Sequence, residues 1–332
     1  MGTRNVTSVI LDGKQVVCQY GQWDGYPTYT GVKILEFLQS CDMERFKKAL
    51  KNTTIHVSNV NEAKTYTGST KELGEIANKV FNTQGKLNEQ RKADEEYING
   101  YATVLHLLDQ GEITEKMAED YLAGTRDTGC DILKLIYDRS PEKQPLELFA
   151  LKEEYEGDYS WDIQGIYVLD LDKNVLKMTF DGYTQTLDMA QLPTEIDKEM
   201  LIFENATRVL YELGYRPRKS NNPAENIPIN EQCSGLYQQA AEIAVKLGEE
   251  MKAEYPDFLS SPDEEIRPEN YGQKLIFGFL CEKNGITPED RDSFEKSIAK
   301  PALEDQIQSA SNRASGTQAV VPEPVRTSEP EI

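Results

Sequence analysis

The chain lacks an apolar run of the ~20 residues that a membrane-spanning helix requires. Its first residues, Met1 to Asn5, also lack the basic and then apolar order of a signal peptide. The five cysteines are scattered and include no closely spaced pair of the kind that binds zinc. We therefore expect a soluble cytoplasmic protein with reduced thiols and no membrane contact.

Basic residues are scarce. The 332 residues include 36 Lys and Arg against 57 Asp and Glu, which gives a formal net charge of −21. A surface this acidic repels phosphate backbones and anionic lipids, so direct binding to nucleic acid is not expected. Such a charge keeps a protein in solution, and it also leaves open a decoy that occupies the nucleic-acid site of a basic partner protein.

Groups for acid–base catalysis are few. The only histidines are His56 and His106, and the turn at 124–129 lacks the pattern of a phosphate-binding P-loop. Asp170, Asp172 and Asn174 have the initial spacing of a calcium loop, but the Gly and Glu required later in that loop are absent. The sequence predicts no metal site and no cofactor.

The strand signals lie at both ends of a helical segment. Thr3–Leu11 and Lys14–Tyr20 flank Asp12-Gly13, a preferred hairpin turn, and this two-residue turn would place Val9 opposite Val16. Helical spacing then dominates residues 69–138. Three further strands are predicted later in the chain, at Ile163–Leu171, Val175–Phe180 and Tyr183–Met189. We expect an α/β (α+β) fold in which the hairpin and the later meander share one mixed or antiparallel sheet.

Capping residues set the expected helix boundaries. Helices are predicted to begin after Thr30, Asp42, Ser69, Thr114 and Asp127, and a continuous helix is predicted for Glu89–Leu108.

The second half of the chain is predicted to be helical. Glu195–Leu213, Glu231–Glu254, Glu269–Glu282 and Glu289–Ser309 are its helical segments. The expected organisation is an α/β domain at 1–195, a helical region at 196–309 with a linker near 215–229, and a disordered tail at 310–332.

Part of the chain resembles known proteins. The opening Met1-Gly-Thr-Arg, the hairpin, and the string Gln19-Tyr-Gly-Gln-Trp-Asp-Gly-Tyr-Pro27 are similar to the start of a group of uncharacterised proteins from bacteria, their phages and fungi. Arg126-Asp-Thr-Gly129 and Tyr167-Val-Leu-Asp-Leu-Asp172 resemble that group too. The resemblance covers about residues 1–190. It implies a shared fold and is compatible with a phage-encoded chain. It implies no particular chemistry.

The best candidate site is the aromatic loop, residues 19–29. Four aromatic residues occur in ten positions, mixed with amide and carboxylate groups: Tyr20, Trp23, Tyr26 and Tyr29, with Gln19, Gln22 and Asp24. Aromatic faces beside polar groups are typical of a site for a planar ligand or a peptide side chain. The competing interpretation is that these rings only fill the end of the sheet.

A second candidate is the turn Gly124-Thr-Arg-Asp-Thr-Gly129. Arg126 could supply a cation, together with Arg4, and the turn could present free N–H groups. The simpler interpretation is that Asp127 caps a helix. The combined set of predicted ligand-binding residues is Arg4, Gln22, Trp23, Asp24, Tyr26, Arg126 and Asp127.

These patterns favour a non-catalytic binding or regulatory protein. The ligand or peptide would bind at the aromatic loop, and the helical half would contact a protein partner. Two alternatives remain open. One is a hydrolase that uses Cys18 or Asp24 with Arg4 or Arg126, and the other is the acidic decoy.

Overall fold

The computed structural model describes residues 3–58, 71–92, 98–125, 128–140, 142–157, 163–215, 228–256 and 267–298, with backbone only for 71–73. These ranges leave out residues 216–227 of the predicted linker, the predicted tail, and Arg126 and Asp127. None of the helices in the described part of the chain is long and apolar enough to cross a membrane.

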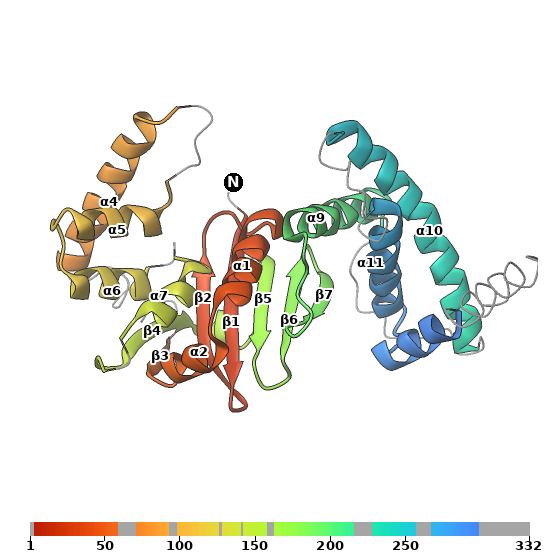
Figure 1. Ribbon diagram of the computed structural model, residues 1–332, viewed down its shortest axis with the longest axis horizontal. Helices are drawn as coiled ribbons and strands as arrows, with labels where there is room; N and C mark the ends of the chain where they lie inside the picture. The colour runs from red at the N-terminus through yellow and green to blue at the C-terminus, as the bar shows by residue number, and fades with distance from the viewer. Residues whose placement is uncertain are drawn as a thin grey trace, which may run out of the picture.

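One five-stranded sheet forms the centre of the molecule (Figure 1). Its strands are β1 (Arg4–Leu11), β2 (Lys14–Gly21), β5 (Ile163–Asp170), β6 (Val175–Phe180) and β7 (Tyr183–Asp188), in the order β2-β1-β5-β6-β7. The central pair β1 and β5 is parallel, and the other neighbours are antiparallel. This mixed sheet confirms the prediction that the hairpin and the later meander join.

The hairpin turn is as predicted, but its register is not. Asp12 and Gly13 both have positive φ, as the predicted turn requires. A bulge between Val9 and Ile10 then shifts the pairing by one residue, so that Val9 lies opposite Val17 instead of Val16. The shift persists to the end of the hairpin and places Asn5 opposite Gly21.

Helices pack on the sheet through a continuous apolar core. The chain leaves β2 through a π-helix, η1 (Pro27–Gly31), followed by α1 (Val32–Ser40) and α2 (Met43–Leu50). The long helix α9 (Ile196–Glu212) crosses the same end of the sheet (Figure 1). A Cβ atom at Gly31 would lie 3.1 Å from Met200 Sδ, so η1 and α9 are in close contact.

The capping predictions are confirmed in part. Asp42 and Thr114 accept hydrogen bonds from the first turns of α2 and α6 (Glu115–Gly124). Thr30 does not cap α1, because its hydroxyl instead donates to the carbonyl oxygen of Asp24. The helix predicted for Glu89–Leu108 is wrong. α4 (Lys71–Glu89) ends there, and α5 (Gly100–Asp109) begins later with Asn99 as its N-cap.

The segment between β2 and β5 forms a helical insert with its own small core. Its members include Ile76 and Val80 of α4, Val104 and Leu107 of α5, and Leu122 of α6. Figure 1 shows α4, α5 and α6 on the β2 side of the sheet. The insert also contains elements that the sequence patterns missed: the parallel pair β3 (Thr53–Ser58) and β4 (Leu146–Leu151), and the short helix α8 (Lys152–Tyr155). Helix α7 (Asp131–Asp138) lies between α6 and β4.

The C-terminal helices pack on the opposite side, next to β7 and α9 (Figure 1). α10 (Ile229–Glu254) and α11 (Pro268–Lys283) follow the predicted segments closely. A helix at 288–298 agrees with the first part of the predicted segment Glu289–Ser309, whose residues 299–309 lie outside the described ranges. Leu247 and Ile276 belong to the same core cluster as Val9 of the sheet. A polar contact joins the two halves as well: Gln185 Nε2 of β7 donates to the Tyr271 hydroxyl of α11 at 2.7 Å.

The structure predicts that Gly165→Ala destabilises the protein. A Cβ atom there would overlap the Gly25 carbonyl oxygen and would lie 2.9 Å from Tyr167 Cε2. Overpacking of this kind costs about 1–3 kcal/mol in the free energy of unfolding, measured by urea denaturation. Gly85→Ala is the matched control. A Cβ atom at this helical glycine meets no atom within 4 Å, so this variant should gain about 0.5–1 kcal/mol. Equal effects of the two substitutions would contradict the packing.

Glu199 of α9 should make stability depend on pH. Burial raises its pKa, a hydrogen bond from Tyr271 lowers it, and the charge of Glu195 raises it, with a net increase. The folded protein therefore holds this proton more tightly than the unfolded chain, and stability falls as the pH rises above about 4.3, the pKa of an unfolded Glu. Glu199→Gln should raise the melting temperature relative to the wild type more at pH 7 than at pH 4. An equal difference at both pH values would refute this assignment.

Candidate functional site

The aromatic loop borders a hollow of about 900 Å³. One wall consists of the end of β2 and the loop, including Gly21, Gln22, Trp23 and Asp24. Helix α4 and the N-terminal end of α5 form the facing wall, and residues at 128–131 close the floor. The volume lies within the range of small-molecule sites, about 300–1,000 Å³. The interpretation of these rings as a plug for the end of the sheet fits Tyr20, which is buried, but it does not fit Trp23, which is 58% exposed.

Hydrogen bonds from the core hold the backbone of the loop at each residue from Trp23 to Gly25. Asn5 Nδ2 donates to the Trp23 carbonyl at 3.0 Å, and the Thr30 hydroxyl donates to the Asp24 carbonyl at 2.6 Å. The buried Tyr167 hydroxyl donates to the Gly25 carbonyl at 2.9 Å, while the Gly25 N–H donates to the carbonyl of Thr3. The three carbonyl groups are thus satisfied internally, and the hollow is lined by Gln22, Trp23 and Asp24 from this loop.

Three consecutive side chains of the loop line the hollow. The Trp23 ring offers an accessible aromatic face. Gln22 accepts a hydrogen bond from the Tyr20 hydroxyl at 2.8 Å through Oε1, which directs its amide and leaves the Nε2 hydrogens for another acceptor. Asp24 has a left-handed backbone with φ 55°, and its exposed carboxylate has no hydrogen bond or ion pair among the described residues.

The facing wall is contributed by the helical insert. Phe81 of α4 is 75% exposed, an unusual position for a large apolar ring. Asn78 and Gln84 lie on the same helix, and Tyr101 and Tyr121 add two partly buried rings from α5 and α6. The hollow therefore has aromatic groups on both sides and polar groups between them.

A charged cluster lies at the floor. Lys33 Nζ pairs with the Asp131 carboxylate at 3.1 Å and lies 4.8 Å from the centre of the Tyr29 ring. Asn99 Nδ2 reaches Asp131 at 3.4 Å and the Tyr29 hydroxyl at 3.5 Å. Burial lowers the pKa of Lys33, but the Asp131 charge and the nearby Cys130 and Tyr29 groups raise it. The pKa of Lys33 ends above its usual value. Burial and then the Asp131 charge raise the pKa of Tyr101 to about 12.

Asn5 connects the floor to the loop. Its side chain is 1% exposed, and its Oδ1 accepts no hydrogen bond in the described part of the chain. The amide lies against Gly21, where a Cβ atom would come within 2.7 Å of both its nitrogen and its oxygen. A Cβ atom at Gly129 would lie 3.7 Å from the same oxygen, an ordinary van der Waals contact. Because Gly21 has no side chain, the Asn5 carboxamide fits at this edge of the hollow.

The structure unites some of the predicted ligand-binding residues. Gln22, Trp23 and Asp24 line the hollow. Tyr26 does not, since its ring packs against Phe180 at 5.9 Å between ring centroids, and Arg4 at the start of β1 is likewise not among the lining residues. For Arg126 and Asp127 the structure describes only their neighbours Thr125 and Thr128, which do line the hollow; the role of this turn stays a prediction.

Sequence reasoning missed the floor and the facing wall. Lys33 and Asp131 are 98 residues apart, so no local pattern relates them. Phe81 reads as one more apolar residue of an amphipathic helix. Asn99 gave a usable signal, because Asn is a preferred N-cap residue, but the helix expected across this position obscured it.

Cys18, one of the residues of the proposed hydrolase, is not among the residues that line the hollow. Cys18 is buried in a cluster with Val6, Tyr20 and Ala150. Burial raises the pKa of Cys18 to about 12, so its thiol stays protonated at neutral pH. The carboxylates at 170–172 stabilise turns: Asp172 accepts from the N–H groups of Asp12 and Gly13. The described residues include no group of three or more His, Cys, Asp or Glu arranged to hold a metal.

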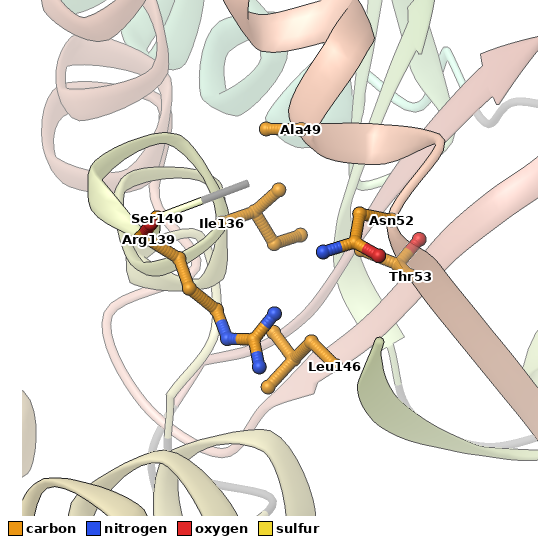
Figure 2. Close-up of a pocket in the computed structure, with 7 residues that line it drawn as sticks. All are labelled: Ala49, Asn52, Thr53, Ile136, Arg139, Ser140 and Leu146. Atoms are coloured by element: carbon orange, nitrogen blue, oxygen red, sulfur yellow. The ribbon is translucent and has the colours of Figure 1, made fainter. Parts of the chain in front are cut away.

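A second, much smaller pocket lies between α2, α7 and β4 (Figure 2). Its volume is about 10 Å³, room for about one water molecule. Arg139 lines it and pairs with Glu119 at 3.2 Å, so its charge is already neutralised. This pocket belongs to the packing of the insert, and the large hollow remains the candidate site.

Comparison of the chain with protein-family models, curated proteins and solved structures gives no match. The interpretation of the hollow therefore rests on its own geometry.

Cys18 should resist alkylation. At pH 8 a pKa near 12 instead of 9.0 leaves on the order of 10²–10³ times less thiolate. Mass spectrometry of protein treated with iodoacetamide should show Cys18 reacting slower by that factor in the native protein than in urea. Half-buried Cys41 serves as the internal control and should be modified first. Rapid modification of native Cys18 would contradict the raised pKa and would restore Cys18 as a candidate nucleophile.

Proposed function

We propose that the protein is a non-catalytic binding protein whose ligand occupies the hollow between the aromatic loop and helix α4. The observation that carries this proposal is the exposed Trp23 ring on a loop whose backbone is fixed by core hydrogen bonds. An exposed indole costs solvation free energy in the unbound protein, and a fixed backbone loses little entropy when a ligand orders the site.

The lining supports recognition of a group that is flat and partly apolar. Trp23 and Phe81 supply faces that favour stacking, and Gln22 and Asp24 supply a donor and an acceptor at the edge of such a group. A few polar groups among aromatic surfaces are characteristic of small-molecule and side-chain sites.

Two threonine hydroxyls and one thiol of the lining support binding over catalysis. The Thr30 hydroxyl donates to the Asp24 carbonyl and the Thr128 hydroxyl to the Leu122 carbonyl, so neither proton points to a base. Burial raises the pKa of Cys130, the described thiol at the hollow, to about 12. Nucleophilic catalysis needs a nucleophile beside a base, and these three groups are engaged otherwise.

The helical half is proposed to contact a protein partner. Exposed apolar side chains occur along α9 and α10 and between them: Tyr211, Leu213, Ile229 and Val245. None of these side chains is among the residues that line the hollow, so ligand binding and partner binding would involve separate surfaces. Separate surfaces for a ligand and a partner are the arrangement of a regulatory protein.

Trp23→Ala should weaken the binding of any ligand of the hollow about 5- to 150-fold. The reason is that a lost aromatic stack costs about 1–3 kcal/mol. Titrations that follow thermal stability would use a panel of nucleosides, amines, amino acids and short peptides. Phe81→Ala should weaken the same ligand. Tyr211→Ala, an equally exposed aromatic outside the hollow, is the control and should leave the affinity unchanged. Unchanged affinity in Trp23→Ala would remove the loop from the account.

A further inference from the structure

The accessible charged acceptor of the hollow is Asp24. Its exposed carboxylate has no partner among the described lining residues. A donor brought by a ligand can therefore bond it, whereas the unbonded Asn5 Oδ1 is too buried for a ligand to reach. Gln22 Nε2, the Asn78 amide and the Tyr101 hydroxyl can donate to a ligand as well.

The one described cation of the lining is already neutralised. Lys33 bonds both oxygens of Asp131, at 3.1 and 3.2 Å, and its raised pKa reflects that pairing. With Asp24 added, the described lining carries one negative charge more than positive charge. The chain as a whole carries −21, so its field attracts cations into the hollow and repels anions.

The aromatic groups favour the same kind of ligand. A cation over an indole face gains about 0.5–2 kcal/mol, and Trp is the best of the aromatic side chains for this contact. Trp23 and Asp24 are adjacent residues that both line the hollow, so one cationic group can lie over the ring and bond the carboxylate. A planar guanidinium or amidinium satisfies both at once, because its face stacks while its edge donates hydrogen bonds.

We infer that the ligand of the hollow carries an organic cation with N–H donors, of the guanidinium, amidinium or ammonium type, which stacks on Trp23 and bonds Asp24. This inference rests on the proposed binding function and narrows it to one chemical class. The cation can come from a small free guanidine or from an arginine side chain of a peptide, since both present the same guanidinium head group.

Three probes of nearly equal shape test the charge: benzamidine, neutral benzamide and anionic benzoate. Calorimetric titration of the full chain should show benzamidine binding about tenfold or more tightly than benzamide, and benzoate weakest. Agmatine and the blocked peptide acetyl-Gly-Arg-Gly-amide then distinguish a small free guanidine from a peptide as the source, according to which binds more tightly.

Asp24→Asn should reduce the preference for benzamidine over benzamide severalfold, leaving the part that the cation gains over the Trp23 ring, and it should leave the affinity for benzamide unchanged. Asn tolerates the left-handed backbone at this position, so the loop should keep its shape. Asp109→Asn is the control for net charge, because it removes an exposed carboxylate on α5 that is not among those of the lining. It should leave the preference for benzamidine intact.

The results separate the two proposals. Binding of benzamide or benzoate at least as tight as that of benzamidine, and lost in Trp23→Ala, would overturn the cationic ligand and retain the binding site. A preference for benzamidine that is undiminished in Asp24→Asn would also overturn it. Absence of binding by all probes up to about 10 mM, or binding unaffected by Trp23→Ala, would overturn both.

Discussion

The hydrogen bond from Asn5 to the carbonyl of Trp23 is the constraint on which the candidate site depends. Asn5 lies on the central strand pair of the sheet and is almost fully buried. From there it fixes the carbonyl group of Trp23, at the boundary between the buried core and the hollow. The bulge in the hairpin makes this contact possible, because it places Asn5 opposite Gly21, the one residue type that leaves room for the carboxamide.

The same constraint explains why the side chains of the loop stay exposed. Tyr167 and Thr30 bond the next two carbonyls, so the loop cannot turn its Trp23 ring into the core without breaking several buried hydrogen bonds. The insert provides the facing wall, and its Asn99 meets Asp131 and Tyr29 at the floor. The hollow thus lies between the sheet and a helical unit with its own core, a common location for ligand sites.

The sheet was predictable because its signals are local. The turn Asp12-Gly13, the alternating strands and the capping residues Asp42 and Thr114 each involve only a few neighbouring residues. The aromatic loop was predictable for the same reason, as a dense cluster of rings. What could not be predicted depends on contacts between distant segments: the bulge, the parallel pair β3 and β4, and the pairing of Lys33 with Asp131. The exposure of Phe81 belongs to this group too, since only the packing of α4 decides which face of that helix is covered.

The candidate site requires that the Trp23 ring is open to solvent while Asn5 holds its backbone carbonyl. The chain has two tryptophans, so Trp161→Phe leaves Trp23 as the single indole. Acrylamide quenching of its fluorescence measures this exposure directly. The structure predicts efficient quenching of the native protein, with emission near that of a solvated indole. Blue-shifted emission that acrylamide does not quench would place the ring inside a sealed core and would contradict the binding site.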